Sequence, residues 1–398
     1  MAEEKKRREK GDGSISQRKD GLWVGRYDAG KKPDGKRNIK VVYAKTEKEC
    51  KKKLKELKRE VEKGEHYYIE RSSVEAYMTD WLVSVKKNEL KPKSYDRLEQ
   101  TLKDNVFPNI GHIQLQAIQT TDVQNMINAL RDSGKSHSTI KKAYDAVNAS
   151  FKYGLACNPP KVNKNPAFNV SIPSKKILPS KKIQFYTQQE ATIICDHAMS
   201  NFKNGKRHYR LGAFVPLLIN TGLRMSELLA LKWKTDIDLE NKTLTVHQNI
   251  VFVRDRDEDS DKNYKIIEQD TVKTQAGQDR TIPLNSAAVN ALFDLQSITG
   301  QETYVMTTKE KTLVKPRQLD QMFRRIVVDA GFPSEKVYGV HSLRHTFATL
   351  LLLNHTDIKT VSKLLGHNDV STTYNTYIHV IKEVEAEAIN SIPELTAK

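Results

Sequence analysis

The sequence has few cysteines and no long apolar run. Its three cysteines lie far apart among 398 residues, without a Cys-x-x-Cys pair or the spacing of metal ligands. This excludes a disulfide framework and predicts reduced thiols in an intracellular protein. No apolar stretch is long enough to cross a bilayer, and the basic first ten residues lack the apolar segment of a signal peptide. We therefore expect a cytoplasmic protein without a membrane partner.

Acidic residues are scarce relative to basic ones. There are 66 Lys and Arg against 49 Asp and Glu, which gives a net charge of +17. This surplus favours a polyanionic partner, because Lys and Arg displace the counterions condensed on nucleic acid. Residues 1–65 alone carry 22 Lys and Arg against 13 Asp and Glu. The hydrophobic share of 38% is large enough to build cores, which excludes a disordered chain.

Residues 1–65 predict a small sheet packed on one helix. Short alternating runs at 13–18, 22–28 and 36–44 predict three strands separated by Gly- and Pro-containing turns. Thr46 and Glu49 then match a capping box at the start of a helix that reaches about residue 63.

The rest of the chain predicts two more units. Residues 72–173 carry apolar side chains at helical spacing throughout, and a lysine- and proline-rich stretch follows them. Residues 183–398 predict mainly helices, with strands near 243–253, 265–272 and 280–283. The expected fold class is therefore mainly α with small β-sheets (α+β).

Charged side chains in the last unit lie where predicted elements begin or end. Arg224 and Glu227 are three residues apart, so the carboxylate can position the guanidinium on one helical face. A surface ion pair is the alternative. Lys273 lies just before the turn of a β-hairpin predicted over residues 271–284, where a solvated edge lysine is the alternative.

Histidine and tyrosine side chains follow further along the chain. His341 and Arg344 open an apolar helix, which places both at one helix end. His367 comes directly after a glycine that ends a helix. The alternative to a catalytic role is that its side chain caps the last carbonyls of that helix. Tyr374 and Tyr377 lie seven and ten residues beyond His367. A buried structural tyrosine is the alternative for either one.

The order and spacing of these motifs resemble the tyrosine recombinases of the phage integrase family. G-L-R-M-S-E-L, V-K-T, H-S-L-R-H-T-F-A-T, L-L-G-H and Y-I-H-V occur in the family's order and span the last unit, about half of the chain. F-P-N-I-G and N-P-A in the middle unit resemble the family's core-binding domain. The basic first unit resembles the arm-binding domain of integrases from conjugative transposons. The resemblance thus implies an arm-type DNA-binding domain (1–65), a helical core-DNA-binding domain (72–173) and a catalytic domain with a C-terminal helix (183–398).

The resemblance also implies a role for each motif. Because the family places its nucleophile nine or ten residues after the last histidine, Tyr377 is favoured over Tyr374 to form a covalent 3′-phosphotyrosine. Two arginines clamp the phosphate, and the histidines donate hydrogen bonds or move protons. A lysine protonates the departing 5′ oxygen, and no cofactor, metal or ATP is required. The implied catalytic set is Arg224, Lys273, His341, Arg344, His367 and Tyr377, with Glu227 in support.

Candidate DNA-binding residues come from the first two units. A strand ribbon fits the major groove, where arginine can read guanine, and helix starts rich in basic and hydroxyl residues suit phosphates. The strand candidates are Arg18, Trp23, Arg26, Tyr27, Lys36, Arg37 and Lys40. The helix-start candidates are Lys91, Lys93, Ser94, Tyr95, Arg97, Lys135, Ser136, Ser138, Lys141 and Lys142.

The implied function is a bacterial integrase that inserts and excises a mobile element through a Holliday junction. Its implied partners are double-stranded DNA with core and arm sites, three further copies in a tetramer, and an excisionase or DNA-bending accessory protein. Three alternatives remain at this point. A chromosome-dimer resolvase or inversion recombinase typically lacks the first unit, a type IB topoisomerase acts as a monomer, and a repressor needs no catalytic set.

Overall fold

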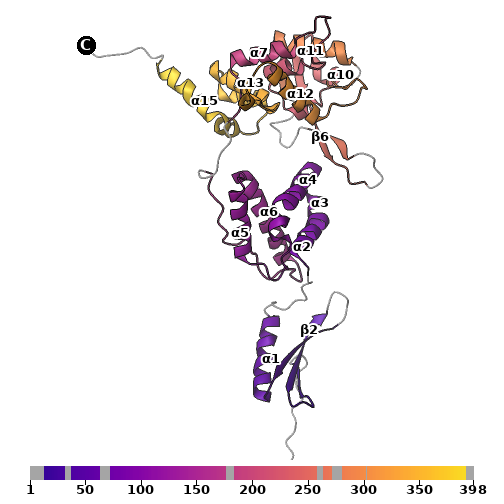
Figure 1. Ribbon diagram of the computed structural model, residues 1–398, viewed down its shortest axis with the longest axis vertical. Coiled ribbons are helices and arrows are strands. Elements are labelled where there is room, and N and C mark those ends of the chain that lie inside the picture. Colours follow the sequence, from indigo (N-terminus) through magenta and orange to yellow (C-terminus); the bar gives the residue numbers. More distant parts are fainter. Residues whose placement is uncertain are drawn as a thin grey trace, which may run out of the picture. The chain divides into compact units, whose positions relative to one another are not determined.

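The chain divides into two compact units, Met1–Ser180 and Lys181–Lys398, and each is described by itself. Helices predominate in the described residues, and their strands form small antiparallel sheets (Figure 1), which confirms the predicted fold class. No helix of the described residues is long and apolar enough to span a bilayer. The computed structural model describes residues 13–31, 37–62, 72–175, 183–257, 263–270, 280–301 and 303–390.

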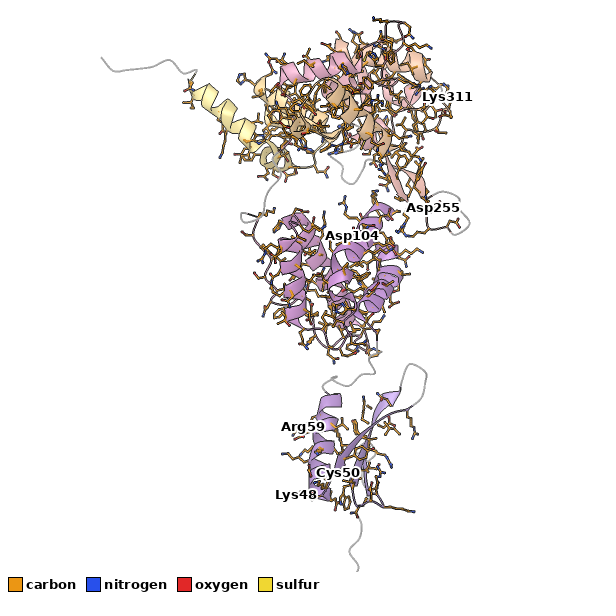
Figure 2. All side chains as sticks on the ribbon, viewed as in Figure 1. Lys48, Cys50, Arg59, Asp104, Asp255 and Lys311 are labelled. Carbon is orange, nitrogen blue, oxygen red and sulfur yellow. The ribbon has the colours of Figure 1, made fainter. Side chains whose placement is uncertain are left out.

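The N-terminal sheet packs on one helix, as predicted. Cys50, Leu54 and Leu57 of the helix are buried, and Figure 2 labels Cys50 on this helix. A Cβ on Gly25 would lie 3.2 Å from Leu54 Cδ1 and 3.3 Å from Cys50 Sγ, so glycine allows this close packing. Strand order is β1-β2-β3. The elements are β1 (Ser14–Gln17), β2 (Trp23–Lys31), β3 (Arg37–Ala44) and α1 (Glu47–Glu62).

The middle of the chain is a helical bundle, as the apolar spacing predicted. Trp81, Leu102 and Phe151 are fully buried in its core. Ser73 and Ser136 cap helices by accepting hydrogen bonds from Ala76 and Thr139 backbone N–H groups. The elements are α2 (Val74–Trp81), the π-helical η1 (Leu82–Lys86), α3 (Lys87–Glu89), α4 (Pro92–Thr101), the π-helical η2 (Leu102–Gly111), α5 (Thr120–Asp132) and α6 (His137–Ala156).

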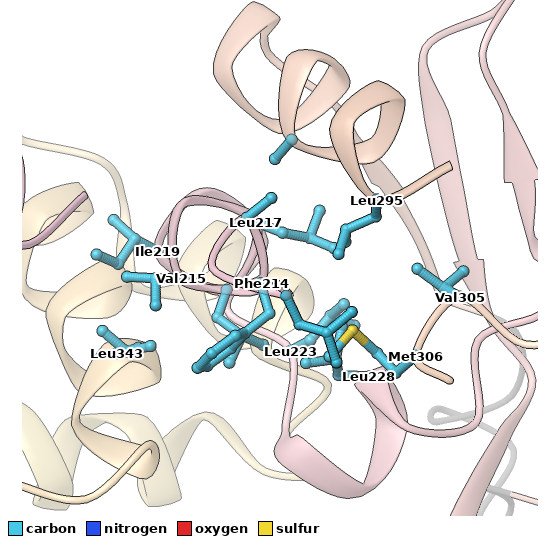
Figure 3. Packing of buried hydrophobic residues seen from close by; sticks show 14 of the residues in the cluster. Phe214, Val215, Leu217, Ile219, Leu223, Leu228, Leu295, Val305, Met306 and Leu343 are labelled. Atoms are coloured by element: carbon cyan, nitrogen blue, oxygen red, sulfur yellow. The ribbon is translucent and has the colours of Figure 1, made fainter. Parts of the chain in front are cut away.

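The second unit packs helices and short strands around α8. Phe214, Leu217 and Leu228 lie in one core with Leu295 and Leu343 from distant helices (Figure 3). The helices are α7 (Gln188–Ala198), α8 (Phe214–Thr221), α9 (Met225–Leu228), α10 (Trp233–Asp236), α11 (Ser286–Thr299), α12 (Pro316–Asp329), η4 (Ser334–Lys336), α13 (His341–Leu353), α14 (Ile358–Leu365) and α15 (Val370–Asn390). The strands are β4 (Ile237–Asp238), β5 (Thr243–Val246), β6 (Gln248–Arg254), β7 (Tyr264–Asp270) and β8 (Arg280–Pro283).

The described strands of this unit form two sheets, and most of the hairpin expected over residues 271–284 lies outside the described residues. β8 pairs with β5, in the order β4-β5-β8, whereas β7 pairs with β6. Ile282 of β8 is buried and pairs with Leu244 of β5, 38 residues earlier. Residues 271–279, including Lys273, lie outside the described residues.

A tight contact inside the helical bundle provides a test of its packing. The Oη of Tyr77 donates a hydrogen bond of 2.6 Å to the carbonyl of Ser150, and a Cβ on Gly154 would lie 2.3 Å from that Oη. Gly154→Ala should therefore lower the free energy of unfolding by about 1–3 kcal/mol through overpacking, although alanine favours helices. Urea unfolding measures it. Lys152→Ala, at an exposed position of the same helix, should stay within about 0.5 kcal/mol, and a stabilised Gly154→Ala would contradict the packing argument.

Candidate active site

A glycine turn places the first predicted arginine. Gly222 ends α8 in the left-handed region with φ of 63°, and a Cβ there would lie 2.3 Å from a ring carbon of Phe347. Only glycine meets both demands, so α13 packs directly against this turn. Arg224 follows as the residue that caps α9 rather than one inside a helix, and its backbone N–H donates to Glu227 Oε2 at 2.8 Å.

A buried carboxylate joins two arginines. Glu227, 3% exposed, accepts hydrogen bonds from Arg224 Nη1 at 2.7 Å and from Arg280 Nη2 at 2.6 Å and Nη1 at 3.1 Å. Burial by itself would raise the pKa of Glu227, but the two arginines outweigh it and hold that pKa at about 2. The carboxylate is therefore ionised, and it holds Arg224 against α9 as the sequence predicted.

Arg344 is fixed by the ends of two helices. Its Nη1 donates to the Gly222 carbonyl and its Nη2 to the Leu365 carbonyl, both at 2.7 Å, and the residue is 3% exposed. Burial and the nearby charge of Arg224 lower the pKa of Arg344 to about 9, so it stays charged near neutral pH. The guanidinium is thereby held in one orientation before any ligand arrives.

His367 contacts Arg344 directly. Its Nε2 lies 3.0 Å from Arg344 Nη2, and its Nδ1 lies 2.8 Å from Thr373 Oγ1. Because an arginine can only donate, Nε2 accepts, and the proton of the neutral ring is on Nδ1. Burial, with the charges of Arg344 and Arg224, lowers the pKa of His367 to about 4. Arg344 thus selects this tautomer, and the Oγ1 of the fully buried Thr373 accepts the Nδ1 proton.

The two tyrosines occupy different environments. Tyr377 is 1% exposed, whereas Tyr374 is 43% exposed. Tyr377 interrupts α15 with non-helical φ and ψ of −110° and 18°, so the helix kinks there. Its Oη lies 2.9 Å from Nδ1 of His345, and burial raises the pKa of Tyr377 to about 12.

His341 lies at the start of α13, near the same charges. Its ring packs edge-on against His345 with 4.7 Å between ring centres, while part of it faces solvent. Partial desolvation, together with the charges of Arg344 and Arg224, lowers the pKa of His341. Burial also lowers the pKa of His345, to about 4, so both histidines of α13 are neutral near pH 7.

Three arginines and one carboxylate leave this cluster with excess positive charge. Arg280 donates hydrogen bonds to Glu227 and to the Leu364 carbonyl, which lies 3.1 Å from Nε. Arg224 makes one short side-chain bond, and its Nη2 lies 3.5 Å from the Gly366 carbonyl. Its remaining N–H groups can bind a phosphate oxygen, and they are the polar donors a phosphodiester needs. Within the described residues, no three His, Cys, Asp or Glu side chains are arranged to hold a metal ion.

The structure adds residues that the sequence did not single out. The cluster contains the predicted residues Arg224, Glu227, His341, Arg344 and His367. Lys273 lies outside the described residues. The additional residues are Arg280, His345 and Thr373. Their sequence signal is proximity: His345 follows Arg344, Arg280 lies in the segment 271–284 where a hairpin was expected, and Thr373 lies between His367 and Tyr377.

Comparisons with known proteins identify the family of this chain. The model of the phage integrase family matches residues 184–383, and the model of its N-terminal SAM-like domain matches residues 73–131. A tyrosine recombinase XerC-like protein of Caldanaerobacter subterraneus subsp. tengcongensis is 30% identical over 92% of this chain and 94% of the relative. The integrase of Staphylococcus phage L54a is 26% identical over 80% and 92%, respectively.

Solved structures share the fold. The Tn1549 transposon integrase in complex with circular intermediate DNA matches with a TM-score of 0.60 and 18% identity, over 80% of this chain and 99% of that one. A lambda integrase dimer bound to a core site matches with a TM-score of 0.54 and 16% identity, over 92% and 96%.

The family match and the 30% identical relative define a recombination enzyme of the tyrosine recombinase class. The chain belongs to the phage integrase family. The family resemblance drawn from the motifs is confirmed. The activity of this enzyme is site-specific recombination.

The buried carboxylate predicts how stability depends on pH. The folded-state pKa of Glu227, about 2, lies below the ordinary value of 4.5. The ionised carboxylate therefore stabilises the folded protein fully above pH 4.5, and this stabilisation is lost as pH falls through 2. Glu227→Gln should lower the free energy of unfolding at pH 7 by about 3–5 kcal/mol, because two arginines lose a buried partner. The deficit should shrink as pH falls from 4.5 toward 2.

Urea unfolding of both proteins over this pH range measures the effect. Glu240→Gln, at an exposed position, is the control and should match wild type within about 0.5 kcal/mol at each pH. A deficit for Glu227→Gln that stays constant down to pH 2 would show that the carboxylate charge is not the stabilising feature.

Proposed function

We propose that this tyrosine recombinase is an integrase that cuts and exchanges DNA strands at specific sites to integrate and excise a mobile element, as in conjugative transposons. One observation carries the proposal: segments far apart in sequence bring two oriented arginines and two histidines beside a buried tyrosine. Such a cluster suits a phosphodiester, because its donors are fixed before the transition state forms.

The proposed chemistry uses each member of the predicted set. Arg224 and Arg344 hold the two non-bridging oxygens of the scissile phosphate. Tyr377 attacks phosphorus, giving a 3′-phosphotyrosine that keeps the energy of the broken bond. Lys273 protonates the departing 5′ oxygen. His367 orients Arg344, and Glu227 orients Arg224. No cofactor, metal or ATP takes part in this scheme.

In this proposal the three domains have separate roles. Residues 1–65 bind distal arm sites, residues 72–173 bind the core site, and residues 183–398 catalyse DNA cleavage and rejoining. The helix-start candidates support the second role, since Lys91, Lys93, Ser94, Arg97, Lys135, Ser136, Ser138, Lys141 and Lys142 are exposed. Tyr95 is a correction: it is 6% exposed and packs in the bundle core, because its position in α4 belongs to the apolar stripe.

The strand candidates divide between the two faces of the N-terminal sheet. Arg26 pairs with Val41, and alternation places Arg37 on the same face, away from α1. Trp23, Tyr27 and Lys40 alternate onto the face that α1 covers, so we propose DNA contact for the open face. Arg18 lies beside the turn after β1, and Lys36 is outside the described residues.

Assembly follows from the reaction. Exchange of four strands requires four active sites, so we propose a homotetramer on double-stranded DNA with a Holliday-junction intermediate, and an excisionase or DNA-bending protein as accessory. A lambda integrase tetramer bound to a Holliday junction has a similar fold, with a TM-score of 0.53. The end of α15 exposes Ile389 at 68%, which suits docking on a neighbouring copy. The place of action is the bacterial cytoplasm, at the nucleoid.

Trapping the covalent intermediate tests the proposed nucleophile. On a nicked core site, Tyr377→Phe should give no covalent protein–DNA complex, because only the attacking oxygen is lost, while DNA affinity stays within about twofold of wild type. Tyr374→Phe is the matched control and should trap DNA as wild type does. Denaturing gels measure the complex, and a covalent complex with Tyr377→Phe would refute the assignment.

The open face of the sheet predicts which basic residues bind arm DNA. Arg26→Ala and Arg37→Ala should each weaken arm-site binding by about 10- to 100-fold, as expected where an arginine reads a base edge. Lys40→Ala, on the helix-covered face, is the control and should change affinity by less than about threefold. Gel-shift titrations on arm and core DNA measure both. Equal losses for all three variants would contradict the division between faces.

A further inference from the structure

The hydroxyl of Tyr377 is hydrogen-bonded to a histidine outside the predicted catalytic set. His345 Nδ1 lies 2.9 Å from it, and in the described part of the chain the rest of the tyrosine packs among apolar side chains such as Val361 and Val380. We propose that His345 accepts the proton of Tyr377 as the hydroxyl attacks DNA, and returns it when the strand is rejoined. This rests on the proposed function, in which Tyr377 is the nucleophile.

The other two histidines of the cluster are less well placed for this proton. His367 has both ring nitrogens engaged, one by Arg344 and one by Thr373, so it cannot accept without breaking a bond. His341 makes ring contact with His345 and is bonded to neither tyrosine in the described structure. A general base must lie about 2.6–3.2 Å from the proton's oxygen, and His345 meets this condition. Nδ1 accepts when the ring proton is on Nε2.

The surrounding charges keep this transfer from happening without DNA. Burial raises the pKa of Tyr377 to about 12, and burial with the charges of His341 and Arg344 lowers the pKa of His345 to about 4. The proton therefore stays on the tyrosine in the free protein. A phosphate held by Arg344 offsets that positive charge and favours a protonated imidazole beside it. Substrate binding thus turns His345 into a base at the place where one is needed.

The step balances in atoms and electrons. A lone pair of Tyr377 Oη forms the bond to phosphorus, and the Oη proton moves to Nδ1 of His345. The bond from phosphorus to the 5′ oxygen breaks, and that oxygen takes a proton from the general acid, proposed as Lys273. Rejoining runs in reverse: the 5′ hydroxyl attacks, Tyr377 leaves, and His345 gives back its proton.

Single-turnover cleavage of a nicked core site tests the role. His345→Ala and His345→Asn should each slow covalent-complex formation by about 10²–10⁴-fold, with DNA affinity and Tm close to wild type. Asparagine keeps a hydrogen-bonding group but cannot take the proton, so it should not restore the rate. Added imidazole should rescue His345→Ala, and the rescue should increase with pH as the added imidazole loses its proton. His355→Asn, at an exposed position beyond the same helix, is the control and should cleave normally.

A substrate with a 5′-bridging sulfur separates base from acid. Its thiolate leaves without a proton, so Lys273→Ala should recover on it while His345→Ala stays slow. Rescue of His345→Ala by the sulfur, full activity of His345→Asn, or faster cleavage by His345→Ala would each overturn the proposal. If Tyr377→Phe still formed the covalent complex, the proposed nucleophile would fail instead, whatever the His345 variants do.

Discussion

The ionised carboxylate of Glu227 is the interaction on which the active site depends. It lies at 3% exposure and binds arginines from two segments, Arg224 before α9 and Arg280 at the start of β8. A buried charge without partners costs several kcal/mol, so the three side chains are stable only together. Their pairing ties a strand of one sheet to the turn that presents Arg224, at the place that we propose binds the phosphate.

The end of α14 completes this arrangement by supplying acceptors. The last carbonyls of a helix have no partner inside it, and here they receive all three arginines: Leu364 from Arg280, Leu365 from Arg344 and Gly366 from Arg224. Left-handed Gly366 ends the helix and leaves room for Arg280, whose Nη1 would lie 2.7 Å from a Cβ there. Helix termini thus orient the positive charges, with the negative end of the helix dipole facing them.

Burial of polar groups also controls reactivity. Desolvation, with the arginine charges, lowers the pKa of His345 and His367, and desolvation raises that of Tyr377. All three are therefore neutral in the free protein. In the proposed reaction the bound phosphate changes this balance, because its negative charge offsets the charges of the arginines. The fixed donors and the raised pKa of Tyr377, the proposed nucleophile, both follow from the same low-dielectric environment.

The sequence by itself determined the secondary structure, the fold class and the family, because apolar periodicity, glycine turns and motif order are local properties of the chain. It also determined that Arg224 and Glu227 act together, since they are three residues apart. It failed for Tyr95, where core packing overrode the local helix-start signal. Only the tertiary structure decided that Arg280 shares Glu227, that Arg344 sets the His367 tautomer and that His345 binds Tyr377. The physical reason is that hydrogen bonds in a buried cluster depend on which helix ends and strands lie together in space. The spacing of residues along the chain does not predict these contacts.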